Sequence, residues 1–273
     1  MTGEAIVTEP KMPAASETIL VERDGAIVTV ILNRPHKLNA LTKPMWQLLG
    51  ETMNRLSADD SVRCVVVRGA GGKAFSPGND ISEFETERSN REQAIAYGRI
   101  MHATAEAIGD CRHPTIAQIE GICVGGGLEI AAMCDLRICG ESSRFGAPIK
   151  NLGLVMAHPE MAPLIRLVGP AVALEILYEG RIFAAAEAKD KRLVNRVVPD
   201  TRVADECRET AQRIADGAPL VARWHKKFAR QLMSGAPIGE QEYLESFDCF
   251  DTEDFRIGYQ AFLAKAKPGF VGR

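Results

Sequence analysis

The sequence predicts an α/β fold in which buried parallel strands alternate with helices, followed by a mostly helical C-terminal region. Short β-branched runs alternate with stretches of helical periodicity as far as about residue 200. Glycine-rich loops separate these units, and little strand signal follows "NRVVP". The chain has 273 residues, 46% hydrophobic and 25% charged, which is typical of a globular enzyme with one large domain and an appendage.

The N-terminal part of the chain supplies the first elements of this fold. Residues 1–17 are polar and contain proline, so we expect a flexible leader there. "TILVERDGAIVTVILN" predicts two strands joined by a hairpin turn at its Asp-Gly pair. Residues 42–60 show helical spacing of apolar side chains, with Thr42 as the N-cap and Pro44 in the first turn. "VRCVVVRGA" then predicts a buried strand, because it is short, β-branched and almost entirely apolar.

The same cycle of strand and helix continues along the chain. A glycine-rich loop at 69–80 leads into a polar helical stretch that ends near Ile108. "HPTIAQIEG" predicts a strand, "GGLEIAAMC" a helix and "DLRIC" another strand. From about Pro159 helical segments predominate. We therefore expect an α/β core at 18–200 and a helical C-terminal region at 201–273.

The charge and cysteine content exclude several classes of protein. The net charge is −3, from 33 Lys and Arg against 36 Asp and Glu, so no basic field attracts nucleic acid or anionic lipid. The seven cysteines form no C-x-x-C pair and lie mostly in apolar runs, which indicates buried thiols in a reducing compartment. The first residues lack the pattern of a signal peptide, and no apolar run approaches the length that crosses a bilayer. We expect a cytoplasmic protein without nucleic-acid or membrane partners.

Two glycine-rich loops, "RGAGGKAFSPG" and "CVGGGLEI", follow predicted strands. Neither contains G-x-x-x-x-G-K-[ST] or G-x-G-x-x-G, so neither predicts a nucleotide site. Unpaired N–H groups at a helix start suit a carbonyl oxygen that gains negative charge. One such group from "GGG" and one from "SPGND" would together form an oxyanion hole. A tight turn explains each loop, taken singly, at least as well.

Glu129 lies in the first turn of the helix after the three glycines, with apolar or small residues around it. Such surroundings raise the pKa of a carboxyl group and suit a general acid or base. The alternative is a surface acid, which the helix dipole favours by about 0.3–1 kcal/mol. His158 and Glu160 begin a later helix, where packing or capping explains them better than catalysis. No pair of the five histidines has metal-ligand spacing, so we expect no metal site.

Taken as a set, these residues resemble the crotonase (enoyl-CoA hydratase/isomerase) superfamily. The matching stretches follow the family's order and cover nearly all of residues 18–270. They are "NRPHKLNAL" (33–41), "GKAFSPGNDISEF" (72–84), "AQIEGICVGGGLEIAAMCDLRI" (117–138), "RFGAPIKNLGL" (144–154), "LEILYEGRIFAAAEAKDKRLVNRVV" (174–198) and "FDTEDFRIGYQAFLAKAKPGF" (250–270).

The resemblance implies a crotonase-like spiral of β-β-α repeats, with C-terminal helices that assemble a homotrimer or a dimer of trimers. It implies an acyl-CoA thioester as substrate and no cofactor other than the coenzyme A that the substrate carries. The thioester carbonyl would lie between the backbone N–H groups of Asn79 and Gly126, and Glu129 would serve as acid and base. The positions that the resemblance assigns to the substrate and its CoA are Lys37, Leu38, Ala40, Ser76, Gly78, Asp80, Ile81, Ser82, Gly125, Ile149, Phe262 and Lys265.

The sequence departs from the family's pattern at one catalytic position. Typical hydratases carry a second glutamate in an "FGxPE" segment, and here "FGAPIKNLG" places Ile149 at that position. Glu160, His158 or Lys150 would have to substitute from nearby. The resemblance therefore implies an enzyme of the enoyl-CoA hydratase or isomerase type in which Glu129 is the one matching glutamate. The alternatives are a decarboxylase or another one-base acyl-CoA reaction, and a CoA-thioester binder without activity.

Overall fold

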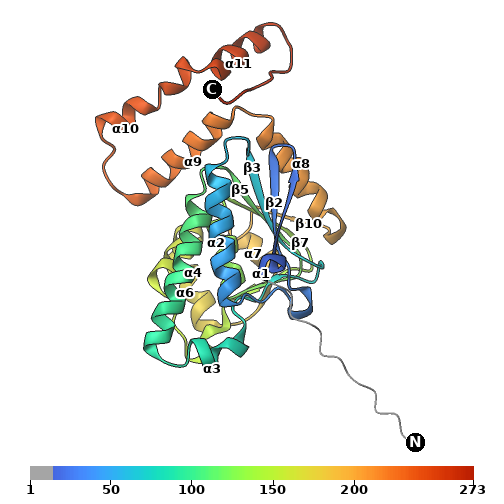
Figure 1. Ribbon diagram of the computed structural model, residues 1–273, viewed down its shortest axis with the longest axis vertical. Coiled ribbons are helices and arrows are strands. Elements are labelled where there is room, and N and C mark those ends of the chain that lie inside the picture. The colour runs from blue at the N-terminus through green and yellow to red at the C-terminus, as the bar shows by residue number, and fades with distance from the viewer. Residues whose placement is uncertain (1–14) are drawn as a thin grey trace, which may run out of the picture.

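The computed structural model describes residues 15–273, and Figure 1 shows how its elements are arranged. The predicted leader lies outside the described residues except for residues 15–17, which belong to helix α1. The strands are β1 (Ile19–Asp24), β2 (Ile27–Leu32), β3 (Cys64–Gly69), β4 (Ala74–Ser76), β5 (Thr115–Ile119), β6 (Ile122–Val124), β7 (Leu136–Gly140), β8 (Arg144–Gly146), β9 (Phe183–Ala184) and β10 (Arg196–Val198). The α-helices are α1 (Ala15–Thr18), α2 (Lys43–Ala58), α3 (Phe84–Glu87), α4 (Arg91–Asp110), α5 (Gly126–Met133), α6 (His158–Glu179), α7 (Ala185–Asp190), α8 (Val203–Ala215), α9 (Pro219–Ser234), α10 (Glu240–Glu245) and α11 (Glu253–Leu263). The 3-10 helices are η1 (Pro35–Lys37), η2 (Ile81–Glu83), η3 (Pro148–Leu152), η4 (Asp200–Arg202) and η5 (Asp248–Asp251).

The strands form two sheets. Six strands pair in the order β1-β2-β3-β5-β7-β10, and only the β1–β2 pair is antiparallel. The second sheet has the order β4-β6-β8-β9, and only the β8–β9 pair is antiparallel. Parallel neighbours need a crossover connection, which α2, α4 and α5 supply between β2, β3, β5 and β7. The predicted α/β fold with parallel pairing is confirmed.

Each repeat contributes one strand to each sheet and then a helix. The strands β3 and β4 precede α4, β5 and β6 precede α5, and β7 and β8 precede α6. The spiral of β-β-α repeats is therefore confirmed. Hydrophobic periodicity predicted β3, β5 and β7 but not β4, β6 and β8, because strands of three residues are too short to show alternation.

The six-stranded sheet is covered on both faces, as β3 shows. Val65 and Val67 pack in the main core on one face. Cys64 and Val66 point to the other face and pack in a second apolar cluster beneath α8. A strand places successive side chains on opposite faces, so a strand covered on both sides is apolar throughout. This is why "CVVV" reads as a continuous apolar run.

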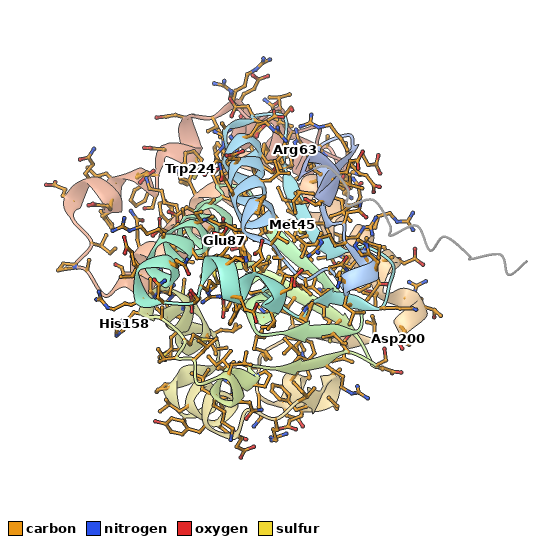
Figure 2. The ribbon with its side chains drawn as sticks, turned by 60° about the horizontal axis from the view of Figure 1, so that its bottom comes forward. Met45, Arg63, Glu87, His158, Asp200 and Trp224 are labelled. Atoms are coloured by element: carbon orange, nitrogen blue, oxygen red, sulfur yellow. The ribbon has the colours of Figure 1, made fainter. Side chains whose placement is uncertain are left out.

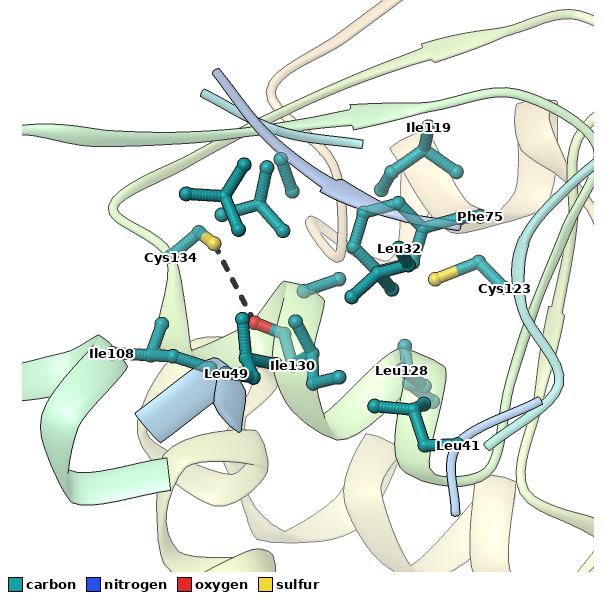
Figure 3. Packing of buried hydrophobic residues seen from close by; sticks show 14 of the residues in the cluster. Leu32, Leu41, Leu49, Phe75, Ile108, Ile119, Cys123, Leu128, Ile130 and Cys134 are labelled. Atoms are coloured by element: carbon teal, nitrogen blue, oxygen red, sulfur yellow. Dashed lines mark hydrogen bonds between the residues drawn. The ribbon is translucent and has the colours of Figure 1, made fainter. Parts of the chain in front are cut away.

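Helix α5 is anchored by apolar side chains inside the main core. Leu128 and Ile130 are both 1% exposed and pack among the buried side chains drawn in Figure 3, which include Leu41 and Leu49. Leu128 and Ile130 immediately precede and follow Glu129 in the sequence. The helix is therefore fixed in rotation, and the direction in which Glu129 points is fixed with it.

The C-terminal helices divide into two groups. Helix α8 packs on the six-stranded sheet through Val203, Cys207 and Ala211, so the predicted boundary at residue 200 precedes a helix that covers the core. Beyond α9, residues 235–273 form a C-terminal arm that carries α10 and α11 away from the sheets (Figure 1). The arm exposes large apolar side chains, namely Ile238, Tyr243, Leu244, Phe247, Phe250, Phe255, Tyr259, Phe262, Leu263 and Val271.

Helix α6 is long and apolar enough, by length and composition alone, to cross a membrane. This finding corrects the expectation that no apolar run approaches that length. The helix is kinked at Gly169, whose φ of 79° is not helical, and it continues beyond this residue to Glu179. Leu164, Ala173 and Ile176 pack in the main core, which accounts for part of its apolar character.

Candidate active site

Two loops from distant parts of the sequence, residues 37–41 and 76–82, lie side by side at the candidate site. The Leu41 N–H donates to the Gly78 carbonyl at 2.8 Å, and the Asp80 N–H donates to the Leu41 carbonyl at 2.8 Å. The Ser76 hydroxyl donates to the Asn39 carbonyl at 2.9 Å. The structure thus brings together the two segments that the sequence assigns to CoA.

A buried ion pair stabilises the same two loops. The Arg34 Nη1 atom lies 3.0 Å from Asp80 Oδ2, and it also donates to the Ala40 carbonyl at 2.7 Å. Burial alone would raise the pKa of Asp80, but hydrogen bonds from Ser82 and the guanidinium of Arg34 lower it below its ordinary value. Asp80 therefore stays ionised and holds the 76–82 loop in place.

The glycine loops approach each other so closely that side chains are excluded. A Cβ atom on Gly78 would lie 2.4 Å from the Gly126 nitrogen, and φ of Gly78 is 95°. A Cβ atom on Gly126 would lie 3.1 Å from the Trp46 ring and 3.2 Å from the Gly78 Cα. The preceding residue, Gly125, has φ 53° and ψ −125°, a conformation that only glycine adopts readily. The glycines in "SPGND" and "GGG" are therefore required by one backbone contact.

Two backbone N–H groups at this contact, those of Asn79 and Gly126, have no acceptor among residues 15–273. Both hydrogen bonds of the bridge between Leu41 and Asn79 are made by the residues flanking Asn79, so its own amide points away from Leu41. Gly126 is the first residue of α5, where a helix offers no acceptor. The Trp46 indole donates to the Asn79 side-chain oxygen at 2.6 Å and its ring lies beside Gly126, which fixes the two residues relative to each other.

Glu129 points into a small cavity of about 10 Å³, the size that one water molecule needs. The cavity lies between α2, α4, α5 and α6, and it is lined by Trp46, Met101, Ala105, Ile108, Glu129, Ile130, Met133 and Glu160. Burial raises the pKa of Glu129 to about 8, the charge of Glu160 adds to this rise, and Arg88 opposes it. Glu129 is therefore protonated at neutral pH.

Glu160 is the second carboxyl group of this cavity. It lies in the first turn of α6, where its Oε2 accepts the Ala157 N–H at 2.9 Å. Its Oε1 lies 3.1 Å from His102 Nε2 of α4. Both carboxylate oxygens of Glu160 are therefore engaged. One caps the start of α6, and the other contacts the imidazole of His102. The capping role expected from the sequence is present, together with a position beside Glu129.

The other residues considered for the missing acid lie elsewhere. Ile149 is on η3, and its side chain is partly buried against the main core. Lys150 is exposed and packs over Gly180. His158 is exposed and lies at the edge of the molecule in Figure 2. Of the three substitutes named from the sequence, the structure brings Glu160 alone into the cavity of Glu129.

The predicted CoA positions fall into two groups. Those in the 37–41 and 76–82 loops surround the free amides, together with Gly125, whose N–H donates to the Gly146 carbonyl at 2.9 Å. Phe262 and Lys265 belong to the C-terminal arm, and Figure 1 shows α11 at the opposite end of the molecule from α3, which follows the 76–82 loop. Phe262 is 83% exposed. Within one chain, these two residues are not brought to the site.

Sequence reasoning missed two residues beside the carboxyl groups. His102 had no evident partner, because Glu160 lies 58 positions along the chain and the contact depends on how α4 and α6 pack. Trp46 reads in the sequence as an ordinary apolar residue of an amphipathic helix. No sequence signal distinguishes its indole N–H, which reaches Asn79 across the site.

Two further features of the described residues bear on the site. No group of three or more His, Cys, Asp or Glu side chains within 15–273 is arranged to hold a metal ion. A larger cavity of about 830 Å³ opens between α4, α6 and α9, with His102, Arg166 and Arg230 in its wall. It contains neither Glu129 nor the glycine loops, so its size does not make it the reaction site.

Comparison with known proteins identifies a family for almost the whole chain. The sequence model of the family described as "Enoyl-CoA hydratase/isomerase" matches residues 22–273. The "Probable enoyl-CoA hydratase echA8" of Mycobacterium tuberculosis is 35% identical over 262 residues, which is 94% of this chain and 99% of that protein. The short-chain-enoyl-CoA hydratase of Clostridium acetobutylicum is 31% identical over 258 residues, covering 93% and 98% of the two chains.

Solved structures agree with this result. An enoyl-CoA hydratase/carnithine racemase from Magnetospirillum magneticum is 51% identical and superposes with a TM-score of 0.92, covering 94% of this chain and 96% of that one. The enoyl-CoA hydratase of Bacillus anthracis is 31% identical with a TM-score of 0.86, covering 94% and 100% of the two chains.

Proposed function

The chain belongs to the enoyl-CoA hydratase/isomerase family of enzymes that act on acyl-CoA, and we propose that it adds water to the double bond of a 2-enoyl-CoA thioester. One observation supports this reaction above the others. Glu129 and Glu160, from two different helices, face a cavity that fits one water molecule. Water addition needs one group that accepts a proton and one that donates it, both within reach of the same water and substrate.

The free amides of Asn79 and Gly126 supply the oxyanion hole in this proposal. As water adds to the β carbon, electrons move to the thioester oxygen and an enolate forms. Two N–H groups that are already oriented and unpaired stabilise this charge, and one such donor typically contributes about 10²–10³-fold in kcat. Trp46 keeps the hole open by holding Asn79 and by lying against Gly126. The reaction needs no cofactor beyond the CoA of the substrate.

The two glutamates divide the proton transfers. Glu129 has a raised pKa and holds a proton at neutral pH, which it delivers to the α carbon of the enolate. Glu160 accepts the proton of the attacking water, since its charge contributes to the raised pKa of Glu129. A carboxyl group with a raised pKa beside a second carboxyl group is suited to such a division into acid and base. His102 and the Ala157 N–H orient Glu160 from either side.

Ile149 favours a second candidate from the same family. Without a carboxyl group at that position, a reaction with one base remains open, such as a shift of the double bond by Glu129 or the decarboxylation of a substituted acyl-CoA. Decarboxylation depends mainly on the enolate hole. A binder of CoA thioesters without turnover is the further alternative.

The exposed apolar side chains of the C-terminal arm support assembly as a homotrimer or a dimer of trimers. Tyr243, Phe247 and Phe262 are each 48–83% exposed, and exposed apolar surface of this extent is typical of an interface. Phe262 and Lys265 lie far from the glycine loops of their own chain. Their proposed contact with CoA would therefore be made in the site of a neighbouring subunit.

The test compares Glu129→Gln and Glu160→Gln with Glu92→Gln, an exposed glutamate of α4, as the matched control. We expect each of the first two variants to lose about 10²–10⁴-fold in kcat for hydration of crotonyl-CoA, and the control to be unchanged. Assays with 3-enoyl-CoAs and malonyl-type CoAs run in parallel.

The outcomes separate the candidates. Full hydration by Glu160→Gln would contradict the two-carboxylate assignment and favour one-base chemistry. Decarboxylation that persists in Glu129→Gln would favour the second candidate. Thioester binding without turnover of any of these substrates would favour the binder.

A further inference from the structure

Arg88 carries a half-buried guanidinium that has no hydrogen-bond or ion-pair partner within residues 15–273 and lies beside the candidate site. Its guanidinium lies 4.9 Å from the ring centres of both Phe84 and Tyr97. The Nη1 atom is buried and makes no hydrogen bond, and the guanidinium forms no ion pair with any residue in the described part of the chain. Aromatic faces attract a cation, but they do not replace the hydrogen bonds that Nη1 loses on burial. The buried Nη1 atom therefore lacks an acceptor, which an anionic group of a ligand would supply.

Three of the acidic residues that precede Arg88 are engaged by other groups. Glu83 accepts the Lys43 N–H at 2.9 Å and the Tyr97 hydroxyl at 2.9 Å. Glu87 pairs with the Lys43 ammonium at 2.7 Å. Asp80 pairs with Arg34, as described above. Glu83, Glu87 and Asp80 are therefore held by other groups, and the exposed Glu85 forms no ion pair with Arg88, so no carboxylate among the described residues pairs with this guanidinium.

The position of Arg88 connects it with the acyl end of the candidate site. Tyr97, against which it stacks, lies four residues before Met101 on α4, and Met101 lines the cavity of Glu129. Four residues of helix span about 6 Å, so Arg88 stacks on the turn of α4 that precedes the turn lining the cavity. The positive charge of Arg88 also acts on the carboxyl group of Glu129, which agrees with this placement.

We propose that Arg88 selects acyl-CoA substrates whose acyl chain carries a second anionic group, a carboxylate at the end remote from the thioester. This inference rests on the proposed function, because it places the thioester carbonyl at Asn79 and Gly126. A guanidinium binds a carboxylate through two parallel hydrogen bonds, which a neutral chain end cannot offer. The rings of Phe84 and Tyr97 hold the guanidinium plane in position for that contact.

The test uses pairs of 2-enoyl-CoA thioesters of increasing chain length, each pair made with a terminal carboxylate and with its methyl ester. The ester keeps nearly the same shape and removes the charge. We expect kcat/KM of the wild-type protein to favour the carboxylate by about 10- to 100-fold at the matching chain length, the size of a charge-assisted hydrogen bond. Arg88→Met should remove that preference, and Arg88→Lys should retain part of it.

Arg91→Met is the matched control, because it removes an exposed arginine three positions away. It should keep the preference of the wild-type protein. Equal turnover of acid and ester by the wild-type protein at every length, or an unchanged preference in Arg88→Met, would overturn the inference while leaving the proposed function intact.

Binding separates the failure of the inference from the failure of the proposed function. Saturated thioesters with the same two chain ends are titrated calorimetrically into the wild-type protein and Arg88→Met. If no enoyl thioester is turned over, the proposed hydration fails, but a preference for the acid that Arg88→Met abolishes would still support the role of Arg88. Equal binding of acid and ester, or no binding of either, would refute it.

Discussion

Replacement of Gly78 by alanine tests whether the contact between the two glycine loops positions the reaction. A Cβ atom there would lie 2.4 Å from the Gly126 nitrogen, whereas ordinary contacts begin near 3.4 Å. The loops would therefore have to separate by about 1 Å. A displacement of that size can lower a rate by about 10²-fold, and loss of one oxyanion donor lowers kcat by about 10²–10³-fold. We expect Gly78→Ala to lose about 10²-fold in kcat for crotonyl-CoA hydration.

The matched control is Gly25→Ala in the β1–β2 turn. Gly25 also has a positive φ, 57°, but no atom lies within 4 Å of its would-be Cβ. Both variants carry the backbone strain of an L-residue in this region, about 1–2 kcal/mol, which thermal unfolding measures. Of these two variants, only Gly78→Ala should change kcat. Gly126→Ala, with a milder approach of 3.1 Å to the Trp46 ring, should fall between them.

Two results would refute this reasoning. If Gly78→Ala is folded by circular dichroism and turns over crotonyl-CoA at the rate of Gly25→Ala, the Gly126 amide is not the donor that the loop contact positions. If Gly126→Ala loses more activity than a folded Gly78→Ala, the Trp46 contact is more important than the contact between the loops.

Three predictions concern the carboxyl groups. Burial raises the pKa of Glu129 from its ordinary 4.5 to about 8, so kcat/KM should fall as pH rises through about 8. A flat pH profile of kcat/KM across this range would contradict a protonated Glu129 as the proton donor. The same shift stabilises the folded state fully below pH 4.5, and that contribution is lost as pH rises through about 8, so the melting temperature of the wild-type protein should fall relative to Glu129→Gln between these values. Ile149→Glu should raise the rate of crotonyl-CoA hydration. The gain should be clearest in a Glu160→Gln background, where Ile149→Glu restores a second carboxylate. No gain in a folded double variant would show that position 149 does not reach the cavity.

The sequence was most informative where a single local interaction determines the structure. The apolar run of β3 predicted a strand buried on both faces, and β3 does lie between the main core and the cluster beneath α8. The glycines at 78 and 125–127 predicted either tight turns or backbone N–H donors, and the structure brings the two loops into contact at Gly78 and Gly126. The second sheet could not be predicted from periodicity, since its strands span only two or three residues and pair with partners from other repeats.

The site required contacts between residues that the sequence separates. Glu129 was identifiable because its neighbours in "GGGLEIAAM" are apolar or small, a pattern that can be read from the sequence alone. Glu160 could not be distinguished from His158 or Lys150, since the choice depends on how η3 and the first turn of α6 are placed relative to α5. The capping bond to Ala157 and the contact with His102 make that choice in the folded chain. Arg88 gave no signal at all within the polar run "FETERSNREQ", because its lack of a partner appears only once Glu83 and Glu87 have paired with residues of α2 and α4.

The second acid of the candidate site is Glu160, and position 149 carries none. The segment from Pro148 leads from β8 through η3 and returns to the cavity at the start of α6. The structure places the carboxyl group of Glu160 in the cavity of Glu129, eleven residues along the chain from the position that the resemblance assigns to the second acid. An acid at 160 also caps α6 and can pair with His102, which an acid at 149 on η3 would not do. A glutamate held in this way is oriented before substrate binds, so the loss of the carboxylate at 149 does not by itself remove the base from the cavity.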